Sequence, residues 1–510
     1  MKRIVLTTCI LALAISMSPG GFAQLDPDSP WPMFRHDAAH TAASDMSAPS
    51  VPGLLWSFTP VSPSPLPFSG LFSTAAVSGD GNTYVGAFDN NLYCLSPIGA
   101  IAWSYMTNDY VVGSVALGTG GNVYFGSLSR FYSLTAEGSL TWSYNTVDLG
   151  SSSPAIGSNG AIYIGSDTNN LFALTPSGSL LWSYKTADRM VSSPAVGTDG
   201  RICVGSDDNN LYTFSPAGAL TWSYRTPDYV SSSPVLAEGG KAYVTGDDNV
   251  LYALSPAGSL LWSYKVMSGA FITSPSPALT GAGNLYVASS SRVFLCLTPS
   301  GSLSWSYNTF DPLISSPVVG ANDVGYAGGY SGLLHAFNSD GTLLWTYTAN
   351  ASLTVGSNLA LGDDSRIFLS SLAYLGGGGG FQCIGERPPS FDLIPSSSSP
   401  TVGDPFTIEL TVKPVGGAFD AWAVILAPGG KEFSFYLNNP SALRKGMYPL
   451  ALNVPGLQQP FSKTLLSFGA IPNGAAGTYT IIGGLVPAGR QPTVANAIPD
   501  YLDIEKVVIQ

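Results

Sequence analysis

Residues 152–185 read SSPAIGSNGAIYIGSDTNNLFALTPSGSLLWSYK, and residues 192–225 read SSPAVGTDGRICVGSDDNNLYTFSPAGALTWSYR. Each stretch holds four short apolar runs, rich in β-branched and aromatic residues and separated by turn formers. Asn159-Gly160 fits a two-residue hairpin that needs positive φ angles, as does its counterpart Asp199-Gly200. Helical periodicity is not convincing anywhere in the chain. Each unit is therefore predicted to be a four-stranded antiparallel meander.

The unit recurs about every forty residues. Eight of the ten tryptophans follow this period: Trp56, Trp103, Trp142, Trp182, Trp222, Trp262, Trp305 and Trp345. Meanders repeated at this spacing are typical of β-propeller blades. Since a blade cannot bury both faces alone, we assign the tryptophans to packing between neighbouring blades rather than to ligand binding.

The two ends of the repeat region are predicted to share one blade. The last unit has inner strands at about 357–361, 366–370 and 381–384 but no tryptophan strand after them, while residues 53–58 form an orphan strand around Trp56. Joining the fragments closes the ring and removes an exposed edge. The sequence thus predicts an all-β, eight-bladed propeller over residues 53–386, preceded by a lead-in segment at 24–52.

The pattern Ala-Leu-x-Pro-x-Gly-x-Leu-x-Trp-Ser-Tyr at residues 173–184 returns at 253–264. It resembles the tryptophan-docking repeat of the pyrroloquinoline-quinone-like (PQQ-like) propeller family, which includes quinoproteins and BamB-type proteins. The segment from Trp31 to Asp37, with His40 and Thr41, is similar to the lead-in of that family. The resemblance covers about residues 31–385.

The resemblance implies two different functions. Dehydrogenases of the family place PQQ and calcium on the propeller axis, with a vicinal disulfide and a set of acid and amide calcium ligands in long insertions. In this chain no two cysteines are adjacent, and the loops between blades are short. We therefore expect no cofactor and no catalytic residue, and keep a PQQ- and calcium-dependent oxidoreductase as an alternative.

The composition of the chain indicates where the protein is located and which classes of partner it can bind. Residues 1–23 have a positive start, an apolar core and a small-residue cleavage site, which predicts a signal peptide and export to the periplasm or cell surface. Removing Lys2 and Arg3 takes the net charge from −12 to −14. An acidic protein is a poor partner for nucleic acid. No interior apolar stretch is long enough to predict a membrane span in the mature chain.

The residues after the ring form a separate unit. A linker rich in proline and serine is predicted at 387–400, and alternating strands return over 401–510. Their number and spacing suit an immunoglobulin-like β-sandwich. Such a unit could serve attachment or could be passive.

One polar pattern repeats with the blades. A Thr-x-Asp motif follows several outer strands and supplies Asp109, Asp148, Asp188, Asp228 and Asp311. The loop between the second and third strands supplies Asp167, Asp207 and Asp247, with further Asp and Asn beside them. Because strands alternate in direction, both kinds of loop open on one face, which we call the acidic loop face. Asp and Asn are also good turn formers, so turn chemistry alone explains part of the pattern.

These features favour a non-enzymatic, exported scaffold that binds a protein through its propeller. A carbohydrate-binding or surface-adhesion protein, with a glycan as partner, is the other alternative. His36 and His40 have a spacing compatible with metal binding, but two histidines do not complete a closed site, so we predict that they pack the lead-in against the ring. The four cysteines after the signal are predicted to be buried thiols.

Overall fold

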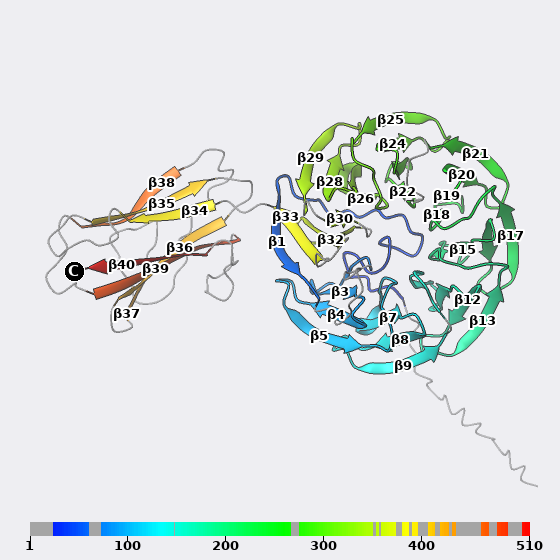
Figure 1. The fold of residues 1–510 in the computed structure, drawn as a ribbon, viewed down its shortest axis with the longest axis horizontal. Helices are drawn as coiled ribbons and strands as arrows, with labels where there is room; N and C mark the ends of the chain where they lie inside the picture. The colour runs from blue at the N-terminus through cyan, green and yellow to red at the C-terminus, as the bar shows by residue number, and fades with distance from the viewer. Residues whose placement is uncertain are drawn as a thin grey trace, which may run out of the picture.

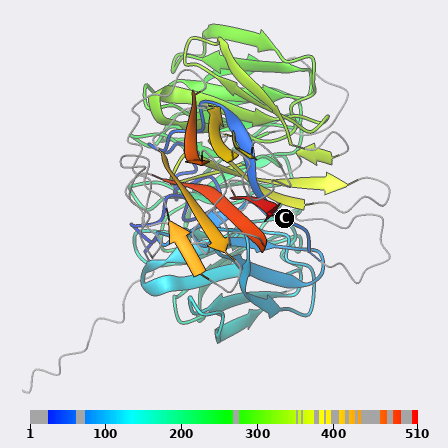
Figure 2. The ribbon, with the colours of Figure 1, turned by 90° about the vertical axis from the view of Figure 1, so that its left-hand side faces the viewer.

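The computed structural model describes residues 24–60, 73–146, 148–266, 275–349, 353–355, 359–373, 380–386, 390–395, 406–413, 419–427, 431–434, 461–468, 477–487 and 502–509. The predicted signal peptide lies outside these residues. Eight antiparallel sheets stand around one axis and form the ring in Figure 1. Figure 2 views the same ring from its edge. The all-β, eight-bladed propeller predicted from the repeat is confirmed.

Seven blades are four-stranded meanders, with the strands in sequence order from the axis outward. Blades 1 to 4 consist of β2 (Ala76–Val77), β3 (Thr83–Gly86), β4 (Asn91–Leu95), β5 (Ile101–Met106); β6 (Ala116–Gly118), β7 (Asn122–Gly126), β8 (Arg130–Leu134), β9 (Leu140–Asn145); β10 (Ala155–Ile156), β11 (Ile162–Gly165), β12 (Asn170–Leu174), β13 (Leu180–Lys185); and β14 (Ala195–Val196), β15 (Ile202–Gly205), β16 (Asn210–Phe214), β17 (Leu220–Arg225).

Blades 5 to 7 consist of β18 (Val235–Leu236), β19 (Ala242–Thr245), β20 (Val250–Leu254), β21 (Leu260–Lys265); β22 (Ala278–Leu279), β23 (Leu285–Ser289), β24 (Val293–Leu297), β25 (Leu303–Asn308); and β26 (Val318–Gly320), β27 (Val324–Gly328), β28 (Leu333–Phe337), β29 (Leu343–Thr348). Two short 3₁₀ turns, η1 (Thr119–Gly121) and η2 (Ala321–Asp323), connect the first two strands of blades 2 and 7.

The eighth blade is completed by the N-terminal strand, as predicted. β1 (Pro52–Phe58) pairs antiparallel with β33 (Gly380–Glu386), placing Trp56 opposite Cys383. β32 (Arg366–Ala373) and β31 (Ala360–Gly362) lie further in. An additional strand that the sequence did not predict, β30 (Leu353–Val355), pairs with the far end of β32. β32 has eight residues, more than the second strand of any other blade, so its far end is free of β31 and can pair with β30.

The turns between the first and second strands differ from the prediction. The N–H of Gly160 donates to the carbonyl of Gly157, whose own N–H donates to Ala161. Only Gly160 has a positive φ, at 78°, while Asn159 does not. These turns are therefore three-residue hairpins with a left-handed glycine, not two-residue hairpins with two positive φ angles.

The tryptophans join neighbouring blades, as predicted. The indole N–H of Trp182 donates to the carbonyl of Pro216 in the next blade at 3.0 Å, and Gly218 of that blade lies against the indole ring. The same indole bond is made by Trp56, Trp103, Trp142, Trp222, Trp262, Trp305 and Trp345. Trp345 reaches Pro49, so the segment before β1 also takes part in ring closure.

A belt of hydrogen bonds near the axis is a second connection between blades. The backbone N–H of Ser153 donates to the hydroxyl of Ser193 in the next blade at 2.9 Å, and the N–H of Ser193 donates in turn to Ser233 at 3.0 Å. The chain of such bonds begins at Thr74 and Ser114 and ends at Ser276 and Ser316. The serine pairs in the repeat thus have a role that the sequence did not reveal.

We expect Ser193→Ala to lower the free energy of unfolding by about 1–3 kcal/mol, because the buried N–H of Ser153 loses its acceptor. Denaturant titration measures this loss. Ser183→Ala, on the exposed outer strand β13, is the control and should change stability by no more than about 0.5 kcal/mol. Equal effects of the two substitutions would contradict the role of the belt.

The lead-in segment crosses one end of the propeller axis (Figure 1). Its backbone carbonyls accept N–H groups at the ends of the innermost strands of six blades; the carbonyls belong to Trp31, Pro32, Ala38, Ala39, Thr41 and Ala42. Trp31 and Met33 are fully buried. The predicted packing of this segment against the ring is confirmed, and it lies at the end of the axis opposite the acidic loop face.

The tail forms two further antiparallel sheets. One contains β34 (Ser390–Pro395), β35 (Phe406–Lys413) and β38 (Phe461–Phe468); the other contains β37 (Lys431–Ser434), β36 (Phe419–Ala427), β39 (Gly477–Pro487) and β40 (Leu502–Ile509). β34 lies inside the predicted linker 387–400, so this part of the linker prediction is wrong: strand pairing with β35 begins at Ser390. An immunoglobulin-like relationship stays a prediction.

Candidate interaction face

The structure brings the two kinds of acidic loop together. The loop after the outermost strand of one blade lies beside the loop between the second and third strands of the next. Asp167 donates its N–H to the carbonyl of Asp148 at 2.9 Å, and Asp247 donates to Tyr229 at 2.9 Å. The prediction that both loops open on one face is therefore confirmed in geometry.

The threonine of the Thr-x-Asp motif closes its turn. The hydroxyl of Thr186 donates to the backbone carbonyl of Asp188 at 2.7 Å and also contacts the carbonyl of Asn169 at 3.1 Å. Thr226 repeats both bonds, with Asp228 and Asn209. The threonines hold the loop in shape through backbone groups, which leaves the neighbouring carboxylates available for other contacts.

Part of the acidic pattern is turn chemistry. In blade 4 a carboxylate oxygen of Asp208 accepts the N–H of Asn210 at 3.1 Å, and Asn209 has a φ of 72°. Such side-chain acceptors and left-handed asparagines are ordinary turn devices. The second aspartate of each Asp-Asp pair, where present, is accordingly structural.

The predicted face residues differ in exposure. Asp148, Asp188 and Asp228 are exposed, whereas Asp109, Asp167 and Asp247 are partly buried. Asp207 and Asp311 are buried, at 4% and 5% exposure, which the sequence pattern did not distinguish. The carboxylate of Asp311 accepts the N–H of Ser331 at 3.1 Å and lies over Gly329, so its contacts are internal to the loops.

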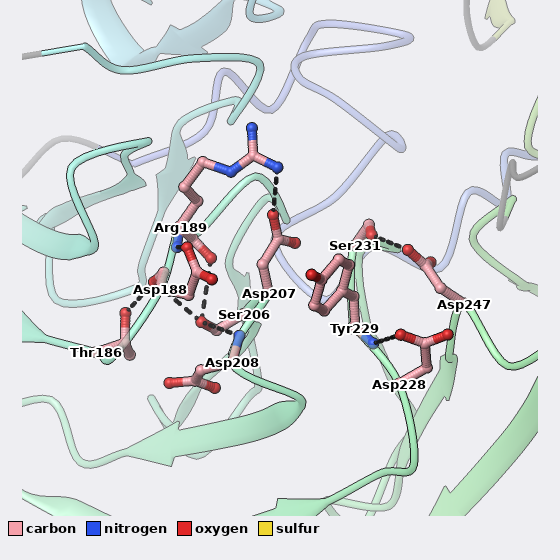
Figure 3. A network of polar contacts seen from close by, with 10 residues as sticks. All are labelled: Thr186, Asp188, Arg189, Ser206, Asp207, Asp208, Asp228, Tyr229, Ser231 and Asp247. Atoms are coloured by element: carbon pink, nitrogen blue, oxygen red, sulfur yellow. Dashed lines mark hydrogen bonds and ion pairs between the residues drawn. The ribbon is translucent and has the colours of Figure 1, made fainter.

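Arg189 is one of four basic residues in this sector; the others, Lys185, Arg225 and Lys265, end the outer strands of blades 3 to 5. The guanidinium of Arg189 lies 2.9 Å from the carboxylate of Asp207 (Figure 3). Burial raises the pKa of Asp207 above its ordinary value. Arg189 acts in the opposite direction and lowers this pKa, whereas the charges of Asp188 and Asp247 raise it further. Burial, with the charge of Asp148, likewise raises the pKa of Asp167. The seven aspartates in the acidic-face loops of blades 3 to 5 outnumber these four basic residues, so the sector carries an excess of acidic groups.

The opposite end of the axis holds the lead-in histidines. His40 is fully buried, and its ring packs edge-on against Phe34 at 5.3 Å. Burial and the nearby charge of Arg35 lower the pKa of His40 to about 3. His36 packs against Trp31 at 5.1 Å. Both rings have the packing role that the sequence analysis assigned to them.

Within the described residues, no three His, Cys, Asp or Glu side chains are arranged to hold a metal ion. Four thiols, of Cys94, Cys203, Cys296 and Cys383, are free and buried, as predicted for small apolar side chains. Burial raises the pKa of Cys203 to about 12, which keeps this thiol protonated at neutral pH.

The fold and the loop geometry define an eight-bladed, tryptophan-docked propeller with one acidic face. Residues 129–279 and 269–381 match the family model described as outer membrane protein assembly factor BamB. The repeats over this range are therefore PQQ-like propeller repeats of the BamB type. No curated protein matches the chain in sequence.

Solved structures share the fold at low identity. BamB from Moraxella catarrhalis is 17% identical, with a TM-score of 0.54 over 66% of this chain and 100% of its own. Quinohemoprotein alcohol dehydrogenase from Comamonas testosteroni is 16% identical, with a TM-score of 0.59 over 72% of this chain and 83% of its own. A europium-containing methanol dehydrogenase is 13% identical, with a TM-score of 0.58 over 70% of this chain and 98% of its own. These similarities establish the fold and leave the function to be inferred from the site.

Proposed function

We propose that this protein is a non-enzymatic, exported scaffold that binds a protein partner in the cell envelope through the acidic loop face. The observation that carries the proposal is the concentration of exposed carboxylates on paired loops of successive blades. Asp148, Asp188 and Asp228 occupy equivalent places in successive blades and are exposed. A row of like charges in fixed loops attracts and orients a basic segment of a partner.

Two further findings support this proposal. The lead-in segment occupies the other end of the axis through backbone hydrogen bonds to six blades, away from the acidic loop face. The matching family model carries the name of an assembly factor. In the described part of the chain, no helix has the length and apolarity needed to cross a bilayer.

Reversing two charges should remove partner capture. We expect Asp188→Lys combined with Asp228→Lys to abolish recovery of the partner from native envelope extracts, because attraction becomes repulsion at the centre of the face. Affinity purification with quantitative mass spectrometry measures the recovery. Circular dichroism should show an unchanged fold, since both side chains are exposed.

The matched control makes the same change of charge elsewhere. Glu137→Lys combined with Glu238→Lys alters exposed turns at the opposite face of blades 2 and 5 and should leave the captured protein unchanged. If the Asp188 and Asp228 double variant recovers the same partners as the native protein, the acidic loop face is not the binding surface.

The oxidoreductase alternative has a direct test. Full-length protein incubated with PQQ and Ca²⁺ and then desalted is expected to retain no quinone absorbance, because no group of three His, Cys, Asp or Glu side chains among the described residues could hold a metal ion. A retained chromophore in stoichiometric amount would favour the alternative over the scaffold.

A further inference from the structure

Three aspartates on the acidic loop face, Asp167, Asp207 and Asp247, each have one buried carboxylate oxygen, Oδ1, without a hydrogen-bond partner among the described residues. Asp207 is 4% exposed; one oxygen, Oδ2, pairs with Arg189, while Oδ1 is buried and has no hydrogen-bond partner among the described residues. Asp247 repeats this: Oδ2 accepts the hydroxyl of Ser231 at 2.6 Å, and Oδ1 is buried without a partner in the same described set. An unsatisfied buried acceptor destabilises the folded protein, and more so when it is charged.

An exposed aromatic ring stands between two of these carboxylates. Figure 3 shows the ring of Tyr229 projecting between Asp207 and Asp247, and the side chain is 46% exposed. The backbone around it is fixed, because the Tyr229 N–H donates to Asp228 at 2.9 Å and its carbonyl accepts the Asp247 N–H at 2.9 Å. A fixed aromatic face beside carboxylates attracts organic cations.

The chemistry of the site selects an organic cation over a metal ion. Ca²⁺ requires six to eight oxygen ligands, and the described residues contain no group of three acidic, His or Cys side chains that could hold a metal. A guanidinium or ammonium needs only acceptors for its N–H groups and tolerates an aromatic neighbour. Arg189 already shows that Asp207 accepts a guanidinium at 2.9 Å.

We propose that Asp207, Asp247 and Tyr229 form a subsite for one arginine or lysine side chain of the protein partner. The proposal rests on the proposed function and specifies where on the acidic loop face the partner is anchored. The incoming cation lies against the tyrosine ring and donates to the carboxylates of Asp207 and Asp247, whose Oδ1 atoms become accessible as these side chains turn toward it. Arg189, which is 53% exposed, competes with it for Asp207.

Binding of a hexa-arginine peptide to the full-length protein tests the subsite. By isothermal titration calorimetry at roughly physiological salt, we expect Asp207→Asn and Asp247→Asn each to weaken binding about tenfold, because each removes a charge-assisted acceptor. Tyr229→Leu should weaken it about threefold through loss of the aromatic face, whereas Tyr229→Phe should bind like the native protein.

Three control variants separate the subsite from the general charge of the protein. Glu238→Gln removes the same charge from an exposed turn at the opposite face of blade 5 and should weaken binding less than about twofold. Arg189→Ala should tighten binding because the competing cation is lost. Lys265→Ala removes an equal positive charge beside Asp248, at the outer strand of the blade that carries Asp247, and should have little effect.

The outcomes distinguish the subsite from the function on which it rests. Equal losses for Asp207→Asn and Glu238→Gln, or no binding of the peptide to the native protein, would overturn the subsite. If partner capture still depends on Asp188 and Asp228, the proposed function then stands without it. Should Asp207→Asn fail to fold, the comparison of Tyr229→Leu with Tyr229→Phe still decides, since this side chain is exposed.

Discussion

Gly218→Ala is expected to lower the free energy of unfolding by about 2–5 kcal/mol. Gly218 has a φ of +83°, where an L-residue costs about 1–2 kcal/mol. A Cβ at this position would lie 2.6 Å from Cδ2 of Trp182 in the preceding blade. The indole cannot move away freely, because its N–H is bonded to Pro216. The remaining cost is therefore overpacking at a blade seam, about 1–3 kcal/mol.

The measurement is denaturant unfolding of the full chain, with Gly239→Ala as the matched control. Gly239 has nearly the same φ, +79°, but nothing lies within 4 Å of the place that an alanine methyl group would occupy there. It therefore reports the backbone cost alone, and the difference between the two variants isolates the contact with the indole. A loss for Gly218→Ala no larger than that for Gly239→Ala would show that the seam is not tightly packed.

A double variant tests the same contact from the other side. Trp182→Ala alone should cost about 3 kcal/mol, since the half-buried indole and its hydrogen bond are lost. Because that variant also removes the atoms against which the new methyl group packs, Trp182→Ala combined with Gly218→Ala should cost clearly less than the two single losses added together. Full additivity would contradict a direct contact.

Mild acid is expected to destabilise the protein through His40. The unfolded chain binds a proton at this residue below about pH 6.5, whereas the folded protein, in which burial and then Arg35 lower the pKa of His40 to about 3, does not. The unfolded state therefore binds more protons, and stability is complete above about pH 6.5 and falls as pH decreases. The slope approaches about 1.4 kcal/mol per pH unit, so the loss by about pH 4.5 is about 2–3 kcal/mol.

The comparison with variants assigns this loss to one side chain. His40→Asn should flatten the decrease in unfolding free energy between about pH 7 and about pH 4.5 relative to the native protein. His36→Asn is the control, because His36 also lies in the lead-in with positive φ but has a ring that is 26% exposed. If His40→Asn retains the full native slope, the acid sensitivity arises elsewhere in the chain.

The sequence predicted the ring because each blade repeats a local signal. Trp182, Gly218 and their sister residues return at a fixed period, and the incomplete units at both ends identified the closing strand around Trp56. The same local signal did not predict β30 or β34, since both depend on pairing with a partner strand elsewhere in the chain. The serine belt was also missed, because a serine in SSP gives no indication of an acceptor role about forty residues away.

For the candidate site, the sequence placed the aspartates on one face but did not predict which of them are exposed and which are buried. Asp188 and Asp207 both follow from the repeat, yet one is exposed and the other is buried beside Arg189. Exposure depends on how the loop of one blade packs on the next, and that packing is absent from the repeat unit itself.

By itself, the sequence of this protein determined the blade, the number of blades and the way the ring closes, because hydrophobic alternation, turn residues and indole spacing act within one unit or between neighbours. Only the tertiary structure decided which end of the axis the lead-in covers and which carboxylates remain half satisfied. Those properties arise where segments distant in the chain meet, so their energies depend on contacts that no local pattern encodes.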